Sequence, residues 1–293
     1  MRAALQKSRI SPDRAFEVKF LKAPHFDPNW HFHSEYQLFI VLRGTGTRFI
    51  GDHVTPFTQG DMVFTGPNLP HLWQSGHEYF EGNKDVWTEG IVVYFHEDFL
   101  GHEFLQKKEA YQLRQLFGRS QQGVRFIGGT QEKAAKLMEE LLQTKDFDGI
   151  LALLRLLNFL AGSQEYKLLS SADYTNLLKA SDTERMNKVH AYVMKNFREK
   201  ITLDEVAEIA NMTPSSFSRY FKTHANKTFS DFLSEIRIGH SCKLLLEKKM
   251  DIAEICYESG FQTLSNFNRQ FKSVTAYSPL AYRKKYADAG YHP

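Results

Sequence analysis

Residues 203–285 contain one short pattern twice, and its side chains are of the kinds that recognise DNA. The copies are Phe217-Ser-Arg219-Tyr-Phe221-Lys222 and Phe267-Asn-Arg269-Gln-Phe271-Lys272, related by a shift of 50 positions. The two Phe of each copy lie four positions apart and share one helical face, which leaves Arg and Lys on other faces. The pattern therefore predicts two anchored helices whose basic side chains can enter a DNA groove.

Two further polar side chains stand on the outward side of each predicted helix with the Arg, and a Lys follows three positions later. Arg donates two hydrogen bonds to guanine, Asn binds adenine and Ser tolerates several bases, whereas Lys suits phosphates. The alternative is a helical interaction domain without DNA. We predict DNA contacts by these eight residues: Ser215, Ser218, Arg219, Lys222, Ser265, Asn266, Arg269 and Lys272.

Capping signals divide this region into short helices. Residues 202–205 have the form of a capping box, and Thr213 before Pro214 can begin the next helix after a short turn. Asp251 begins a second helix pair, which Gly260 can interrupt in a left-handed conformation before the next helix. Short connections of this kind indicate two helix-turn-helix units.

Residues 203–286 resemble the DNA-binding domain of the AraC/XylS transcriptional regulators. The resemblance includes Arg237, Gly260-Phe261 and the closing Ser278-Pro279-Leu-Ala-Tyr282-Arg283. It implies two helix-turn-helix units on successive major-groove faces, with RNA polymerase as a partner. The base-facing positions that it implies are Ser215, Ser218, Arg219, Ser265, Asn266 and Arg269. The family usually has Gly where this chain has Asn226 and Ala276. Because a left-handed Ala costs roughly 1 kcal/mol, we expect the second turn to differ in shape.

The first half of the chain is rich in β-branched and aromatic residues between turn signals. Strands are predicted at 37–42, 48–54, 61–65 and 91–95, which suggests a small barrel or sandwich. Amphipathic helices are predicted at 131–143 and 147–160, and they either cover the barrel or form a dimer seam. Residues 163–182 are predicted to be a linker that could carry a short helix.

Spaced residues in this half resemble the cupin barrels found in front of such DNA-binding domains. They include His31-Phe-His33, Gln37 and Pro70-His71. In cupin enzymes two His, a Glu and a later His hold a metal, but Gln37 occupies the carboxylate position here. First-row metals usually use a carboxylate as well, so we expect neutral, hydrogen-bonding histidines and no metal or other cofactor. Glu35 is the alternative ligand, or it points into solvent.

Resemblance to the sugar-responsive type of these regulators implies that Arg43, His71 and Trp73 line an effector pocket, and His31 and His33 lie nearby in the sequence. Aromatic faces with a few polar groups suit a small polar metabolite such as a sugar. The five candidate effector-binding residues are Arg43, His71, Trp73, His31 and His33.

Composition is that of an ordinary globular protein, and its charge is uneven. From residue 181 onward 17 Lys and Arg face 13 Asp and Glu, whereas the remainder has 20 against 21. The start shows no apolar secretory segment, and the longest apolar stretch, 150–161, is too short to span a bilayer. We therefore expect a cytoplasmic protein whose two cysteines, Cys242 and Cys256, are small buried hydrophobes.

These observations predict an α+β protein with two domains. A cupin-like effector-binding and dimerisation domain (1–162, helices at 131–161) precedes a linker (163–182) and a domain with two helix-turn-helix motifs (183–288). The predicted function is a homodimeric transcription regulator, an activator, that binds double-stranded DNA and has no catalytic residues. The rivals are a metal-dependent cupin enzyme fused to a DNA-targeting domain, and a constitutive DNA-binding protein whose β domain serves only assembly.

Overall fold

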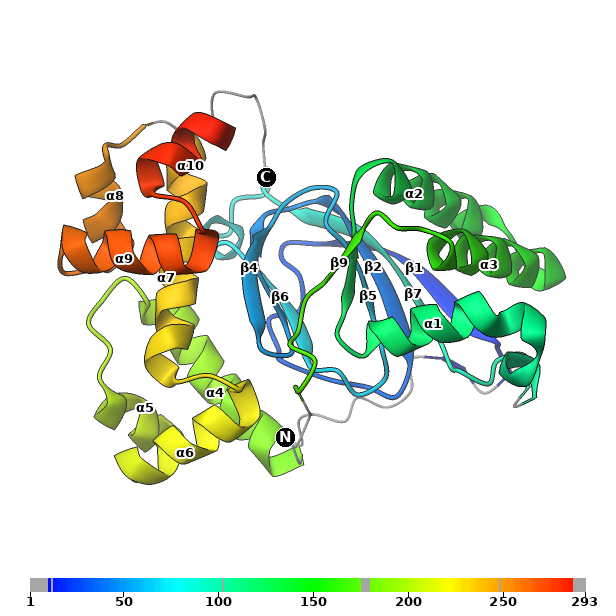
Figure 1. Cartoon of the computed structure of the whole chain (residues 1–293), viewed down its shortest axis with the longest axis horizontal. Coiled ribbons are helices and arrows are strands. Elements are labelled where there is room, and N and C mark those ends of the chain that lie inside the picture. Colours follow the sequence, from blue (N-terminus) through cyan, green and yellow to red (C-terminus); the bar gives the residue numbers. More distant parts are fainter. Residues whose placement is uncertain (1–9, 12, 102, 175–179, 248, 287–293) are drawn as a thin grey trace.

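The structure is a computed structural model that describes residues 10–11, 13–101, 103–174, 180–247 and 249–286. The middle of the predicted linker, 175–179, and the last two residues of the predicted second domain, 287–288, lie outside the described residues. Figure 1 shows three parts side by side: helices α4–α10, a strand-rich body, and helices α1–α3.

The strands form two antiparallel sheets that face each other. One is six-stranded, in the order β1-β7-β2-β5-β8-β9, and the other is three-stranded, in the order β4-β3-β6. The strands are β1 (Phe16–Ala23), β2 (Tyr36–Arg43), β3 (Gly46–Ile50), β4 (His53–Phe57), β5 (Met62–Thr65), β6 (His71–Ser75), β7 (Thr88–Phe95), β8 (Val124–Phe126) and β9 (Tyr166–Leu168).

Three of the four predicted strands are confirmed as parts of β2, β5 and β7, but the prediction of one strand at 48–54 is wrong. The chain turns there, and β3 and β4 form a hairpin in which Ile50 pairs with His53. Gly51, at φ +55°, supplies the left-handed residue that the tight turn needs. Because β-branched residues lie on both sides of the turn, the sequence pattern resembles one continuous strand.

Strand β2 is buried along most of its length because both of its faces are covered. Leu38 and Ile40 face the core shared with helices α1–α3, whereas Phe39 and Val41 face the core between the two sheets. The alternation of a strand therefore places Gln37 on the same side as Phe39, inside the barrel.

Helices α1 (Tyr111–Ser120), α2 (Gly128–Gln143) and α3 (Asp146–Ala161) cover the outer face of the large sheet. The predicted helices at 131–143 and 147–160 are thereby confirmed. The beginning of the predicted linker is not a free connection, because β9 within it pairs with β8. Short 3-10 turns lie at His77–Phe80 (η1), Phe104–Gln106 (η2) and Lys108–Ala110 (η3).

The remaining helices form two compact units around separate cores. They are α4 (Ala180–Asn196), α5 (Leu203–Ile209), α6 (Pro214–Ala225), α7 (Phe229–Glu247), α8 (Ile252–Glu258), α9 (Leu264–Thr275) and α10 (Pro279–Tyr286). Capping boxes open α5 and α8, as predicted. Cys242 and Cys256 are both buried in the core of the second unit, so their predicted role as small hydrophobes is confirmed.

The core of the first helical unit continues into the barrel. Trp30, Phe49 and Val54 of the strand-rich part are buried in one cluster with residues of α4, α6 and α7. Among the described helices, none combines the length and hydrophobicity needed to cross a bilayer.

Candidate nucleic-acid interface and ligand sites

Helices α6 and α9 are built in the same way, which is why the sequence pattern repeats. Phe217 and Phe221 of α6 are completely buried, as are Phe267 and Phe271 of α9. A Thr side chain accepts a hydrogen bond from the backbone at the start of each helix. The buried Phe pair fixes the rotation of each helix about its axis, and so determines which side chains face outward.

The eight predicted DNA contacts are all exposed on these two helices. Arg269 donates a hydrogen bond of 3.0 Å to the Asn266 side chain, so these two are already held together. The members on α6 are Ser215, Ser218, Arg219 and Lys222, and those on α9 are Ser265, Asn266, Arg269 and Lys272.

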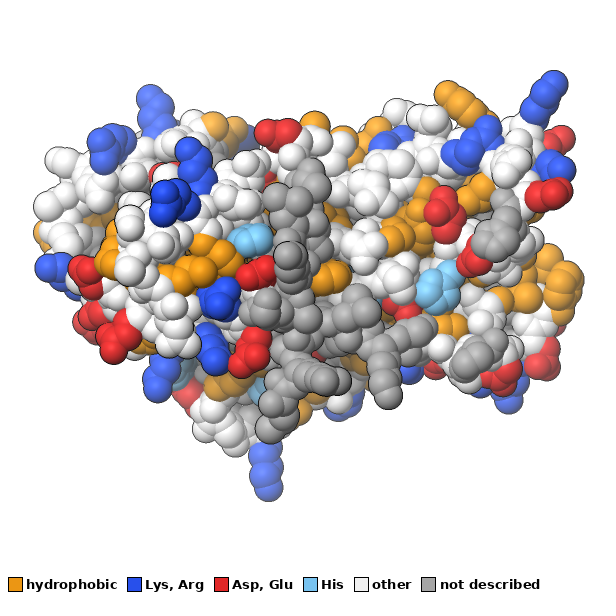
Figure 2. Space-filling model, turned by 90° about the horizontal axis from the view of Figure 1, so that it is seen from below, with side chains coloured by type: hydrophobic (Ala, Val, Ile, Leu, Met, Phe, Trp, Pro, Cys, Tyr) orange, Lys and Arg blue, Asp and Glu red, His pale blue; other side chains and the backbone are white. Residues whose placement is uncertain are grey.

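Lys and Arg side chains are distributed over the helical half of the molecule. In Figure 2 they stand over the left half, which α4–α10 occupy, with Asp and Glu among them, and others stand at the right end. This mixed surface agrees with the small positive excess in the sequence. Positive charge of this size can assist DNA binding but does not by itself select a sequence.

The two turns that lack the usual Gly have the same backbone conformation. Asn226 after α6 and Ala276 after α9 are both left-handed, at φ 53° and 64°. The expectation of a differently shaped second turn is therefore wrong, since the fold imposes the conformation on Ala as well. Asn226 has an additional role, because its side chain donates to Asp52 of the β3–β4 turn at 3.0 Å.

Three histidines meet inside the barrel. His31, His33 and His71 are buried, and one ring nitrogen of each lies within 4.8 Å of the others. The Nδ1 atom of each ring lies 2.7 to 3.1 Å from a backbone carbonyl oxygen. A carbonyl only accepts, so each ring donates from Nδ1 and, when neutral, carries its lone pair on Nε2. Metal-binding histidines are commonly oriented in this way, so this donor set fits a metal ion.

Two polar side chains complete this cluster. The side-chain oxygen Oε1 of Gln37 lies 3.2 Å from Nε2 of both His33 and His71. Glu35 is fully buried, with a carboxylate oxygen 3.4 Å from Nδ1 of His33. It therefore does not point into solvent, and it approaches the far side of the His33 ring instead of acting as a direct ligand.

The five predicted effector residues do not share one pocket. Trp73 lies beside His71, with ring centroids 5.9 Å apart, and donates to Asp61 at 3.2 Å. Arg43 is exposed at the end of β2, where its guanidinium lies 3.3 Å from the ring centroid of Trp87. The structure thus groups the histidines with Trp73 and separates Arg43 from them.

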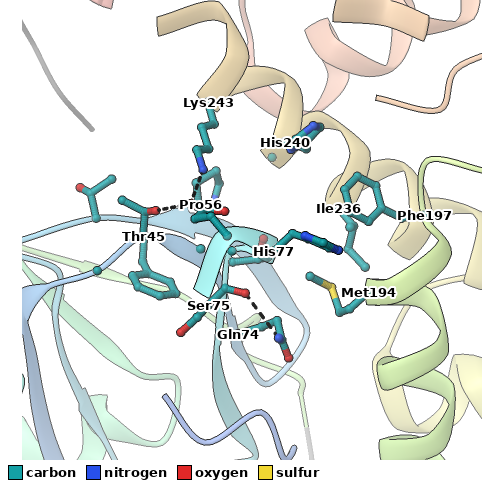
Figure 3. A pocket seen from close by; sticks show the side chains of 18 of the residues that line it. Thr45, Pro56, Gln74, Ser75, His77, Met194, Phe197, Ile236, His240 and Lys243 are labelled. Atoms are coloured by element: carbon teal, nitrogen blue, oxygen red, sulfur yellow. Dashed lines mark hydrogen bonds and ion pairs between the residues drawn. The ribbon is translucent and has the colours of Figure 1, made fainter. Parts of the chain in front are cut away.

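A large cavity lies between the barrel and the helical part. Its volume is about 1190 Å³, and Arg43 contributes to its wall. Figure 3 shows side chains from both parts converging on it. Lys243 of α7 forms an ion pair of 2.6 Å with Glu78 of η1 across the boundary. The residues that line it include Thr45, Gln74, His77, Met194, Phe197 and Ile236. No sequence pattern indicated this cavity, because its walls come from segments far apart in the chain.

An aromatic contact beside the cavity also joins the two parts. His190 of α4 stacks on Trp30 with ring centroids 5.0 Å apart, and its edge meets Phe49 and Phe232. Burial among these apolar rings lowers the pKa of His190 to about 3. His190 is therefore neutral in this arrangement.

Comparisons with known proteins match one segment in each of the two domains. A helix-turn-helix domain model matches residues 206–285, and a cupin domain model matches residues 20–78. The uncharacterized HTH-type transcriptional regulator YdeC of Bacillus subtilis is 22% identical over 87% of this chain and 85% of its own length. The raffinose operon transcriptional regulatory protein RafR of Pediococcus pentosaceus is 28% identical, and the match covers 39% of this chain and 40% of RafR.

Solved structures include two similar chains. ToxT from Vibrio cholerae is 15% identical over 92% of this chain and 98% of its own, with a TM-score of 0.35. The DNA-binding domain of AdpA, solved with a target DNA, is 22% identical over 36% of this chain and 95% of its own, with a TM-score of 0.34. The two domain matches and the regulator sequences identify this chain as a transcriptional regulator with an amino-terminal cupin domain and an AraC-type helix-turn-helix domain.

Proposed function

We propose that this regulator reads its operator with helices α6 and α9, each of which enters a major groove. The supporting observation is that two helices with matching buried Phe pairs expose matching sets of polar and basic side chains. Arg219 and Arg269 are the proposed readers of bases, and Lys222 and Lys272 the proposed phosphate contacts. The remaining four residues are proposed to contact bases beside each Arg: Ser215, Ser218, Ser265 and Asn266.

Selection of bound sequences from random duplex DNA tests this proposal. We expect a site with two short elements about one helical turn apart. Arg219→Ala and Arg269→Ala should each relax specificity in one element, at about 1–3 kcal/mol for the base concerned. Lys222→Ala is the matched comparison, because loss of a phosphate contact weakens all sequences about equally. Absence of any enriched sequence with folded protein at moderate salt would contradict the proposal.

A small polar metabolite, for which a sugar is one candidate class, is the proposed effector. We place it in the cavity between the domains because Arg43 is in the wall and polar groups of the barrel face apolar groups of α4 and α7. A ligand there would touch both domains and so favour one relative placement of them. Screening metabolites by thermal shift, with Gln74→Leu as the pocket variant, tests this placement.

We further propose that the regulator is a cytoplasmic homodimer. It is proposed to activate transcription through RNA polymerase. Transcription in vitro from a template with the selected site would measure the direction of the effect. An increase on addition of the regulator supports activation, and a decrease would make it a repressor. The homodimer is proposed to form through the helices of residues 131–161.

A further inference from the structure

Arg269 of α9 and Arg219 of α6 occupy equivalent positions, but only Arg269 is held by a neighbouring side chain. Its Nη2 donates a hydrogen bond of 3.0 Å to Oδ1 of Asn266, which lies about one helical turn earlier. A guanidinium has only donors, so this contact also settles which atom of the amide is the oxygen. Among the residues that the structure describes, no side chain bonds to the Arg219 guanidinium, and Thr223 bonds only to its backbone carbonyl. The two helices therefore present their arginines differently.

The difference comes from the residue three positions before each Arg. This residue is Asn266 on α9 and Ser216 on α6, and the backbone N–H of each donates to the Thr that caps its helix. The Ser216 hydroxyl is turned back toward this cap, where it accepts a hydrogen bond of 3.0 Å from Thr213. The longer Asn266 side chain reaches along the helix instead, since side chains three positions apart lie on one face. The contact with Arg269 is thus a feature of the second unit.

This contact leaves Arg269 able to read guanine. A guanidinium carries five N–H groups, so one bond to Asn266 leaves a parallel pair for the O6 and N7 acceptors of guanine. An exposed Arg loses rotamer freedom when it binds a base, and this loss weakens binding. Because Asn266 restricts Arg269 beforehand, less freedom is lost on binding guanine. A held side chain also adapts less readily to a different base.

We propose that Asn266 is a positioning residue for Arg269 and makes the α9 element of the operator the more selective of the two. This inference rests on the proposed function, in which both arginines read bases. The amide N–H groups of Asn266 remain available to a neighbouring base, so positioning and its proposed base contact are compatible. Arg219, which no side chain orients in this way, tolerates more bases at its position in the α6 element.

Binding of the full chain to matched duplexes tests this proposal. The probes are a duplex obtained by the selection and three copies that differ at the base pair whose preference Arg269→Ala relaxes. Fluorescence anisotropy gives the ratio of the affinity for guanine to that for each other base. Asn266→Leu keeps the size of the side chain but removes the acceptor, and it should lower this ratio about 2- to 10-fold. Asn268→Leu, at an exposed position on the same helix, is the matched control and should leave the ratio unchanged.

Two further variants separate positioning from a purely structural effect. Asn266→Asp keeps an acceptor for Arg269, so the ratio should be retained although the added negative charge weakens binding to every duplex. Ser216→Asn gives α6 the side chain that α9 has at this position. It should raise the guanine preference of Arg219 in the α6 element about 2- to 10-fold.

An unchanged ratio in Asn266→Leu would overturn the proposal. So would an equal effect of Asn266→Leu on the ratio in the parent and in Arg269→Ala, because a residue that acts through Arg269 has no such effect once Arg269 is absent. Neither result touches the proposed function, which is tested by the selection itself and by Arg269→Ala alone.

Discussion

Asn226 and Ala276 show how two residues can share a backbone conformation at different cost. Both follow the helix with the basic residues, and both are left-handed. Asn tolerates this conformation and here also bonds to Asp52, whereas Ala gains nothing comparable from its methyl group. The repeated architecture therefore constrains the conformation of the turn more strongly than the residue type does.

We predict that Ala276→Gly stabilises the protein by roughly 0.5 to 1 kcal/mol. Relief of the left-handed strain exceeds the entropy that Gly loses on folding. Asn226→Gly is the matched comparison and should destabilise, because it removes the bonds to Asp52 and Ser171. Urea denaturation measures both changes in the free energy of unfolding, provided that the m value stays constant. A loss of stability in Ala276→Gly would show that the turn is not strained.

Helices α5, α6, α8 and α9 were predictable because each has local signals, whereas α1 was not predicted. Capping residues and the period of the Phe pairs lie within a few positions of each other, so α5, α6, α8 and α9 could be located from the sequence. The β3–β4 hairpin and strand β9 were missed, since one depends on a tight turn within apolar residues and the other on pairing with a distant strand. Local patterns do not contain such pairing.

We predict that His190 of helix α4 makes the free energy of unfolding depend on pH. The pKa of His190 is lowered to about 3 by burial, while an unfolded chain has about 6.5, so below pH 6.5 the unfolded chain takes up a proton that the folded chain does not. The contribution of neutral His190 to the free energy of unfolding is complete above pH 6.5 and is lost as the pH falls toward 3. Between pH 7 and pH 5 this histidine should lower the free energy of unfolding by about 2 kcal/mol.

His190→Phe should remove that part of the pH dependence, because a neutral ring keeps the contacts with Trp30, Phe49 and Phe232. Urea unfolding at pH 7 and pH 5 gives the difference. His53 and His240, whose pKa values are each lowered to about 4, act in the same direction and remain in the variant. His77→Phe on the surface is the control. If His190→Phe and the parent lost the same free energy of unfolding between pH 7 and pH 5, His190 would titrate like a histidine of the unfolded chain.

The candidate sites differ in how far the sequence could predict them. The exposed residues of α6 and α9 follow from a repeat, and the histidines of the barrel follow from spacing. Arg43 lies apart from the histidines, because it leaves the barrel interior at the end of β2 and stacks on Trp87. The cavity depends on the packing of two domains, so only the folded molecule reveals it.

Two exposed apolar side chains on α3 suit association of two copies of the chain. Phe147 and Leu151 lie one helical turn apart on α3 and are 68% and 50% exposed, and Figure 2 shows hydrophobic side chains at the end of the molecule where α1–α3 lie. An apolar row on one helix can pair with its own copy across a twofold axis.

Phe147→Glu with Leu151→Glu should therefore convert a dimer into monomers in sedimentation velocity at tens of micromolar. Tyr111→Glu, an equally exposed aromatic position on α1, should remain dimeric. A parent chain that is monomeric with and without its operator would refute the proposed homodimer, whereas a dimer that survives the double change would place the interface elsewhere.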